Sequence, residues 1–481
     1  MSKIIPEENQ KEADLTAQSN TPANRTSKNV ALVICTLSSL ISTYMASAVN
    51  VALPTINNEF HANTIVLSWV ATISLVAVAV FLLPVGRISD IVGIKRILSL
   101  GIAVFAVSSI AAALAHSVVM LLVCMVCQGI GRSMIFANGI AMISAVFPAK
   151  ERGRAIGLNV AAVYIGLSIG PLIGGLLSTH LGWRSIYYAV VPLCLITLLL
   201  IYWQIKDDWR AAKGEKFDYS GSFIYGISLV SLMYGFSVLP DTLGFILVAA
   251  GILVLVIFFN WENRRPSPIL NTAVFRGNRV FVMSNLTALI SYSAVYAIIF
   301  ILSLYLQYIQ GFNADKAGLV LLVQPVTQAI VAPFAGRLSD RIEPQIVASV
   351  GMGLTFLGLL SLAFLSNTTS IILIIITLIV LGAGFGLFSS PNTNAIMGSV
   401  VPKFYGVASA SVGTMRNLGQ MFSMGITMIV LTLVVGRVEM TPQSYPAFLT
   451  ATQVAFSIFS ILSLVGIFTS LVRGKMREKM S

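Results

Sequence analysis

Two arginines interrupt long apolar stretches of the chain. Arg132 lies near the middle of residues 118–146, and Arg416 lies within residues 405–434. A charge at the centre of a membrane helix is costly, so such residues commonly mark a substrate or ion pathway. The pattern predicts non-covalent recognition of a polar or charged group by guanidinium. The alternative is a structural role, in which each arginine is bonded to carbonyls and to amides such as Gln128.

Amides and methionines accompany the arginines in the same kind of stretch. Amides can hydrogen-bond a bound molecule, while Met45, Met125 and Met134 would form a soft apolar wall suited to varied ligands. The residues predicted to line a substrate cavity are Met45, Asn50, Met125, Gln128, Arg132, Gln324, Asn392 and Arg416.

No carboxylate accompanies the arginines. All 18 acidic residues fall in predicted tails, loops or helix ends, and so do His61, His116 and His180. Proton antiport normally uses a buried acid whose protonation competes with substrate, so these residues give no direct support to proton coupling. A cavity with arginine and no carboxylate would have a positive field, which favours neutral or anionic amphiphiles over lipophilic cations.

The elements that position these residues are predicted to be membrane-spanning helices. Of the 481 residues, 57% are hydrophobic and 10% are charged, whereas soluble chains carry about 25% charged residues. There is too little polar surface to cover a soluble body of this size, so the predicted fold class is an all-α polytopic membrane protein. At about 20 apolar residues per span, we expect 14 transmembrane helices, at residues 30–53, 64–85, 97–115, 118–146, 157–179, 186–205, 218–238, 243–260, 280–305, 317–336, 346–365, 370–397, 405–434 and 447–471.

The distribution of basic residues predicts the orientation. If both termini are cytoplasmic, the inner segments contain 25 Lys and Arg residues and the outer segments contain 3, as the positive-inside rule requires. The asymmetry predicts a multi-pass protein of the cell membrane with both termini in the cytoplasm. It also explains the net charge of +12 without a nucleic-acid partner.

Two pairs of segments repeat along the chain. Residues 86–96 (GRISDIVGIKR) match residues 336–344 (GRLSDRIEP) at an offset of 250, and residues 148–166 match residues 402–419 at an offset near 253. Duplicated helical halves are typical of secondary transporters, which bind substrate between the halves. The predicted organisation is a tail at 1–29, a six-helix half at 30–205, two inserted helices with flanking loops at 206–279, a second six-helix half at 280–471 and a tail at 472–481.

Several motifs carry a family resemblance. The loop at 86–96 is similar to the G-x-L-x-D-r-x-G-r-k signature of the major facilitator superfamily, and Gly166, Gly170, Pro171, Gly174 and Gly175 resemble the antiporter motif of its drug-exporting branch. Segments NVALP, GWR, YLQ, PNTNAIMGS and MRNLGQ resemble the fourteen-span drug:proton antiporter family in particular. The resemblance covers the chain after residue 30. It implies the major facilitator fold, with two six-helix halves plus two inserted helices, and proton antiport by alternating access.

The resemblance also implies roles for the two motifs. A conformational latch would consist of Gly86, Asp90, Gly93, Arg96, Gly336 and Asp340. The Asp90 carboxylate could accept hydrogen bonds from the N-terminus of the following helix; the alternative is a solvated loop that only sets topology. In the antiporter motif, Gly166 and Gly170 permit close helix approach and Pro171 permits a bend; the alternative is ordinary packing.

Two positions depart from the family pattern. The family usually has an aspartate where this chain has Met45, and an arginine where it has Met125. Arg132 lies two helical turns beyond Met125, so it could be the family cation in a displaced position. Proton coupling is therefore an expectation from resemblance alone.

These observations favour a secondary transporter that exports amphiphilic small molecules. The alternatives are a lipid or organic-anion carrier without carboxylate-based proton coupling, and a non-transporting membrane sensor, which the small loops disfavour. Since the sequence contains no motif for nucleotide binding, a metal cluster or a nucleophile–base pair, we expect neither enzymatic activity nor a cofactor. The expected partners are a small amphiphile, the lipid bilayer and, by resemblance, protons, and the expected functional unit is a monomer.

Overall fold

The computed structural model describes residues 27–147, 149–210, 212, 214–265, 269, 278–400, 405–436 and 440–474. Most of both predicted tails lies outside these ranges. The described chain folds into helices, which are α2 (Lys28–Phe60), α3 (Thr64–Val92), α4 (Ile94–Ala113), α5 (Val118–Val146), α6 (Ala149–Leu181), α7 (Arg184–Gln204), α8 (Tyr219–Val238), α9 (Thr242–Glu262), α10 (Arg279–Val295), α11 (Ala297–Leu304), the π-helix η2 (Tyr305–Ile309), α12 (Ala314–Leu321), α13 (Val323–Arg341), α14 (Pro344–Leu362), α15 (Ile371–Gly398), α16 (Tyr405–Val434), the 3₁₀ turn η4 (Pro442–Ser444) and α17 (Tyr445–Val472).

The described residues contain 14 helical segments long and apolar enough to cross a membrane. This confirms the predicted fold class and span count. Polar side chains cap the N-termini of several helices by accepting a hydrogen bond from a backbone amide of the first turn. These caps are Asn63, Ser117, Asp218, Asn278 and Ser370. We call the end of the bundle at which α2 ends the outer end, because the charge pattern predicts it to lie outside.

Several helices are longer than the apolar stretches that predicted them. Helix α2 continues beyond residue 53 to Phe60 with Pro54 inside it, and α6 begins at Ala149 although its apolar stretch begins near 157. A window of apolar residues measures only the part that lipid must cover, and a helix can continue into the aqueous layer.

The ninth span is interrupted, which hydropathy could not indicate. Helices α10 and α11 meet near Tyr296, and the span ends in the five-residue π-helix η2. Tyr305 in η2 donates from its hydroxyl to the Ser366 carbonyl over 2.6 Å. Single π turns often occur at functional sites, and this one contains the YLQ segment singled out in the sequence.

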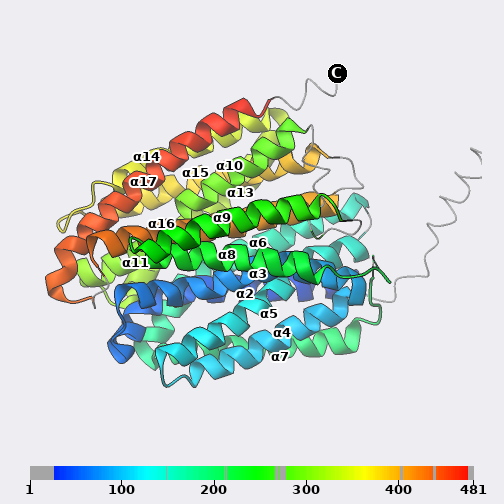
Figure 1. The fold of residues 1–481 in the computed structure, drawn as a ribbon, viewed down its shortest axis with the longest axis horizontal. Coiled ribbons are helices and arrows are strands. Elements are labelled where there is room, and N and C mark those ends of the chain that lie inside the picture. Colours follow the sequence, from blue (N-terminus) through cyan, green and yellow to red (C-terminus); the bar gives the residue numbers. More distant parts are fainter. Residues whose placement is uncertain are drawn as a thin grey trace, which may run out of the picture.

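Glycine contacts recur in the two halves at the offset of the sequence repeat. A Cβ atom built on Gly131 would lie 2.8 Å from the carbonyl oxygen of Gly101, and one on Gly384 would lie 2.7 Å from that of Gly351. The helix pairs α4–α5 and α14–α15 therefore approach in the same way. In Figure 1, α2 to α5 lie in the lower part of the molecule, and α14, α15 and α17 lie in the upper part.

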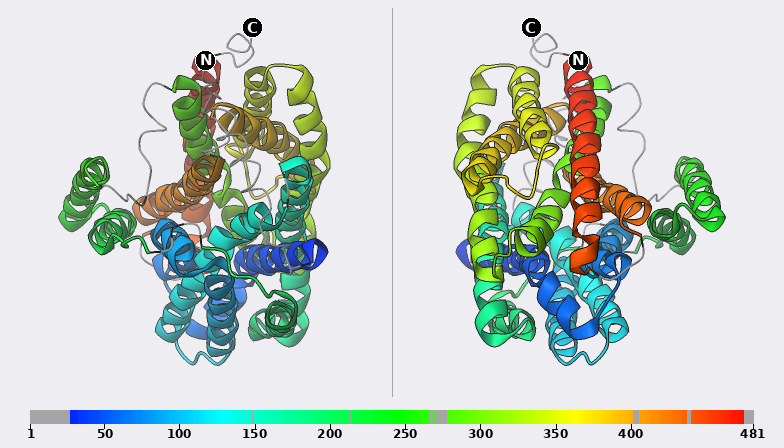
Figure 2. Two further views of the ribbon diagram at one scale, coloured as in Figure 1. Left: turned by 90° about the vertical axis from the view of Figure 1, so that its right-hand side faces the viewer. Right: turned by 90° about the vertical axis from the view of Figure 1, so that its left-hand side faces the viewer.

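Helices α8 and α9 stand beside the other helices (Figure 2). Helix α8 contacts α3 through the Tyr225 hydroxyl, which donates to the Ala79 carbonyl over 3.1 Å. It contacts α16 through Phe236, whose ring centroid lies 6.1 Å from that of Phe422. The hairpin thus packs on one helix from each half.

Candidate functional site

Arg132 is held inside the bundle by two serine hydroxyls. Its Nε donates to Ser42 Oγ of α2 over 3.3 Å, and one terminal nitrogen donates to Ser74 Oγ of α3 over 3.1 Å. Only 7% of the residue is exposed. Three helices of the first half therefore fix one guanidinium group, whose charge the neutral hydroxyls do not cancel.

Among the described residues, Gln128 is not a hydrogen-bond partner of Arg132, which the structural alternative had proposed. Its amide nitrogen donates to Ser109 Oγ of α4 over 2.8 Å. Gln128 lies about one turn from Arg132, but its side chain ties α5 to α4. The guanidinium is bonded to serines because small residues allow α2 and α3 to approach α5 closely.

Arg132 and Arg416 both lie over the ring of Phe136. The Arg132 guanidinium carbon lies 6.0 Å from the Phe136 ring centroid, and that of Arg416 lies 5.6 Å from the same centroid. Phe136 follows Arg132 by four residues, so both lie on one face of α5. Arg416 belongs to α16 of the second half, and the structure thus brings together the two cations that the sequence singled out.

One hydroxyl contact joins the two halves, and one aromatic contact lies beside it within the second half. The Tyr164 hydroxyl of α6 lies 2.9 Å from Ser389 Oγ of α15. On α10, the Tyr292 ring packs edge-on against Phe385 with centroids 5.1 Å apart. The sequence analysis did not select these residues, because Tyr and Ser are common in apolar helices and only tertiary contact distinguishes them.

Within the described residues, neither Arg132 nor Arg416 forms an ion pair. The ion pairs that the described chain contains lie at helix ends, as the pair of Arg184 with Glu59 illustrates. Glu59 is engaged at the outer end, where its Oε2 accepts from Arg184 over 2.6 Å and from Trp183 Nε1 over 2.8 Å. The arginine pair is therefore a site of positive charge.

The predicted methionines are part of the apolar core. Met45 is 1% exposed and Met125 is 3% exposed, and both belong to the main cluster of buried side chains. Met134 is half-buried, with its Cβ against Gly101 of α4. Asn50 turns its amide back to the Ala46 carbonyl of its own helix over 3.3 Å. The methionines thus pack in the core, and Asn50 bonds within its own helix.

Gln324 and Asn392 are both buried, and Asn392 has partners of its own. The backbone carbonyl oxygen of Gln324 lies against Gly382 of α15, and the side chain of Gln324 is buried. Asn392 Oδ1 accepts from the Arg473 guanidinium over 2.9 Å, and its amide donates to the Ser284 carbonyl over 3.1 Å. Burial lowers the pKa of Arg473 to about 10. Asn392 thus stabilises a buried cation at the inner end of α17.

The glycines of the antiporter motif bring α6 against α2. Cβ atoms built on Gly166, Gly170 and Gly174 would lie 2.2, 1.9 and 2.8 Å from Thr43 Oγ1, Ser47 Oγ and Ala48 Cβ respectively. Any larger residue would separate the two helices. The motif is thus a close contact, as its small-residue spacing predicts.

The same motif contacts the second half at the outer end. A Cβ on Gly175 would lie 2.4 Å from the Ala314 carbonyl oxygen, and one on Gly318 would lie 2.1 Å from the Pro171 carbonyl oxygen. Ser303 Oγ of α11 also donates to the Asn50 carbonyl over 2.9 Å. The halves are therefore in direct contact at the outer end.

The first loop signature is held by a carboxylate that the sequence analysis did not select. Asp208 Oδ1, in the segment after α7, accepts from the Lys95 amide over 3.1 Å, and Oδ2 lies 3.2 Å from Arg96 Nε. Gly93 has φ of +131°, and a Cβ there would lie 2.3 Å from the Asp208 carboxylate. In the described structure it is Asp208, and not Asp90, that accepts a hydrogen bond from this helix N-terminus.

The described residues between 205 and 216, here called the strap, contact the inner ends of α3 and α4. The Ala212 amide donates to the Asp90 carbonyl over 2.9 Å, and the Ile94 amide donates to the Trp209 carbonyl over 3.1 Å. Arg87 pairs with Glu215. In the second loop signature, Gly336 lies against Ser390, and the Asp340 side chain is outside the described residues.

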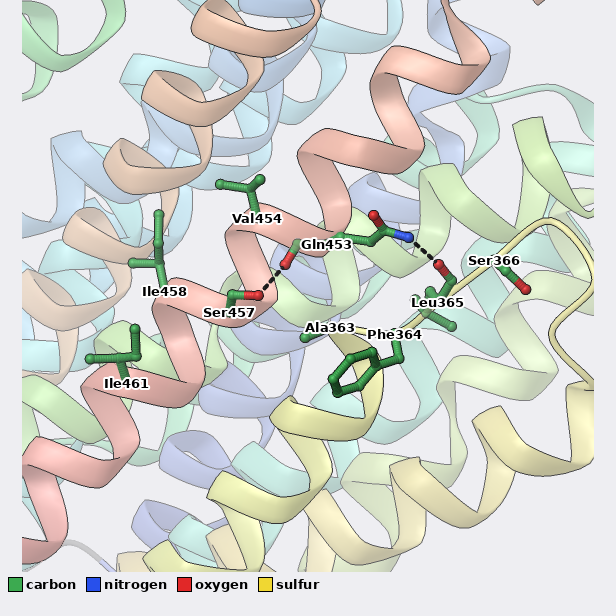
Figure 3. Close-up of a pocket in the computed structure, with 9 residues that line it drawn as sticks. All are labelled: Ala363, Phe364, Leu365, Ser366, Gln453, Val454, Ser457, Ile458 and Ile461. Carbon is green, nitrogen blue, oxygen red and sulfur yellow. Dashed lines mark hydrogen bonds between the residues drawn. The ribbon is translucent and has the colours of Figure 1, made fainter.

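A groove of about 490 Å³ lies away from all these residues (Figure 3). It is formed by the chain after α14 and by α17, where Gln453 donates to the Leu365 carbonyl over 2.7 Å. Phe364 is 77% exposed at its edge. An exposed aromatic on a spanning bundle fits a surface that lipid covers.

Comparison with known proteins identifies relatives over most of the chain. The model of the Major Facilitator Superfamily matches residues 35–424. The riboflavin transporter RibZ of Clostridioides difficile is 29% identical over 398 residues, covering 83% of this chain and 86% of that protein. The multidrug resistance protein Stp of Mycobacterium tuberculosis is 31% identical over 381 residues, covering 78% of this chain and 70% of that protein.

Comparison of structures extends the likeness to the fold. A crystal structure of a D-xylose–proton symporter matches with a TM-score of 0.66 at 14% identity, covering 92% of this chain and 96% of the symporter. At this identity the match concerns the arrangement of helices.

Proposed function

The chain belongs to the Major Facilitator Superfamily, and from this premise we propose that it is a secondary active transporter that exports amphiphilic small molecules by alternating access. The export direction and the substrate class rest on a relative named for multidrug resistance and on one named for tetracenomycin C resistance and export. The protein would act in the cell membrane with both termini in the cytoplasm.

The observation that carries the proposal is the meeting of Arg132 and Arg416 over Phe136. One arginine comes from each half, so a molecule held by both lies between the halves. Transporters built of two helical halves bind substrate there, because rocking of the halves then exposes the molecule to one side at a time. An apolar wall with aromatic side chains suits amphiphiles of varied shape.

The contacts at the outer end support a state that is closed to the outside. The glycine contacts of α6 with α12 bring backbone against backbone, and hydrogen bonds such as Gln307 Nε2 to the Val51 carbonyl, 3.1 Å, add to them. In an exporter this is the state that receives substrate from the cytoplasm.

Proton antiport is the energy source that the family resemblance implies. An exporter of organic anions without carboxylate-based proton coupling is a second candidate, which the absence of ion pairs at both arginines among the described residues favours. The two candidates differ in whether substrate movement dissipates a pH gradient.

The test uses purified protein in proteoliposomes with an acidic lumen and the membrane potential clamped at zero. We expect anilinonaphthalene sulfonate to accumulate in the lumen above the level in protein-free liposomes. Phe364→Ala changes a residue of the groove in Figure 3, away from the arginine pair, and serves as a control variant. It should transport as wild type does. Equal accumulation with and without the protein would contradict export, and an unchanged lumenal pH during accumulation would contradict antiport.

A further inference from the structure

The two central arginines have hydrogen-bonding capacity that the described protein does not use. Arg132 donates through Nε and one terminal nitrogen only, to Ser42 and Ser74. The Arg416 guanidinium lies over the Phe136 ring, and the hydrogen bonds and ion pairs found among the described residues do not include its side chain. A guanidinium group has five N–H donors in a planar fork that matches carboxylates, sulfonates and phosphates. The unused donors of both residues can therefore receive an anion.

The two positive charges repel each other, since both guanidinium groups lie over the Phe136 ring. Two tyrosines, Tyr292 and Tyr296, lie one turn apart where α10 ends. Neutral hydroxyls of this kind can orient a bound anion but cannot cancel its partners' charge. Like charges in a site of low polarity favour occupation by a counter-ion, since the field there is weakly screened.

We propose that the site between Arg132 and Arg416 binds the anionic group of an aromatic amphiphile, with the ligand's ring against Phe136. This inference rests on the proposed function and specifies its substrate class as organic anions of the carboxylate or sulfonate type. Arg132 is the fixed partner, because α2 and α3 hold it. Arg416 is the partner from the opposite half, so the anion connects the two halves.

The connection has a consequence for transport. An anion shared by α5 and α16 removes the repulsion between their arginines and adds charge-assisted hydrogen bonds to both. Binding therefore favours the conformations in which the halves are close at this level. A lipophilic cation of similar size gains neither effect and meets a positive field.

The test compares two compounds that differ by a single sulfonate, anilinonaphthalene sulfonate and phenylnaphthylamine. Equilibrium binding of each radiolabelled compound to immobilised purified protein is measured for wild type, Arg416→Gln and Arg416→Lys. Truncating one partner of a buried charge pair commonly weakens binding by more than about 10-fold. We expect Arg416→Gln to weaken sulfonate binding by at least that factor and to leave amine binding unchanged.

Arg416→Lys keeps the positive charge and should keep most of the sulfonate preference, which excludes misfolding as the cause. Combining Arg416→Gln with Arg132→Gln should weaken binding by less than the product of the single effects, since both residues bind one anion. Equal affinity of wild type for the two compounds, or parallel loss of both in Arg416→Gln, would overturn the assignment. Sulfonate-selective binding without transport in proteoliposomes would instead overturn the proposed function.

Discussion

Single residues decide the charge of the site in this protein. Ser42 of α2 contacts Arg132, and Met45 lies three residues further along the same helix, on the same face. Met45 stands where the family usually has an aspartate. An acid at this position would lie one turn from the serine that holds Arg132, whereas methionine supplies no counter-charge.

Met45→Asp should therefore shift substrate preference away from anions. We expect the variant to lose at least about 10-fold in the ratio of anilinonaphthalene sulfonate to tetraphenylphosphonium transport, because opposite charges about 4 Å apart interact by several kcal/mol in a site of low polarity. Met45→Asn has nearly the same side-chain shape as the aspartate and no charge, and it is the matched control. An unchanged ratio in Met45→Asp, at equal amounts of folded protein, would contradict the positive field.

For single residues, the sequence identified the charged side chains of the site but not the uncharged hydroxyl side chains that contact them or lie near them. Arg132 and Arg416 could be selected because a charge inside an apolar stretch is rare. Ser42, Ser74 and Tyr164 could not, because hydroxyl side chains can bond to their own helix and are common in spans. Asn50 and Asn392 were selected as amides within apolar stretches, and Met45 as part of an apolar wall. In the structure Asn50 bonds within its own helix, Asn392 bonds Arg473 and Met45 lies in the core.

Among the structural elements, the strap is the feature that hydropathy could not reveal. It contains no apolar run, yet Asp208 holds the first turn of α4 and Arg96. In the second half, the start of α14 is also tied to the end of another helix, but by a neutral group. The Gln345 side-chain amide donates to the Leu471 carbonyl at the end of α17. The first loop signature is therefore fastened to the segment that leads to α8.

Asp208→Asn should slow transport without altering substrate affinity. The amide keeps the size of the side chain but loses the charge-assisted hydrogen bond and ion pair, which contribute about 1 to 3 kcal/mol. We expect a lower maximal transport rate with unchanged KM, and partial recovery when Asp208→Arg is combined with Arg96→Asp. A raised KM, or equal damage in the single and combined variants, would show that Asp208 does not act through Arg96.

Helix boundaries were predicted less well than helix number. Apolar length gave fourteen spans because each must cover the same thickness of lipid. It missed the extension of α2 to Phe60 and the π turn at Tyr305–Ile309, since hydrogen bonding, which hydropathy does not measure, determines both.

For the whole molecule, the orientation rests on the count of basic residues. Reporter fusions ending at residue 210 and at residue 481 should both report a cytoplasmic position, and a fusion at Asp241, in the turn between α8 and α9, should report an outside position. The physical reason is that flanking Lys and Arg residues resist translocation. Opposite positions for residues 210 and 481 would require an odd number of spans between them and would contradict the topology.

Each half contributes one arginine to the site, and glycine contacts hold the halves together at the outer end. This arrangement suits rocking of one half against the other. The contact of Gly175 with Ala314 must open for substrate to leave outside. Helix α8, which touches α3 and α16, must adjust when the halves move. Export by alternating access therefore requires at least two distances between the outer ends of the two halves, one when they touch and one when they are open.

Distance measurement between the outer ends tests this requirement most directly. Spin labels at Leu181 of α6 and Lys316 of α12, both exposed, would be placed in a variant whose four cysteines are replaced by serine. We predict one short distance in the empty protein and a second, longer distance when anilinonaphthalene sulfonate and a pH gradient are present. A single short distance under all conditions, in protein that still transports the sulfonate, would contradict alternating access between these halves.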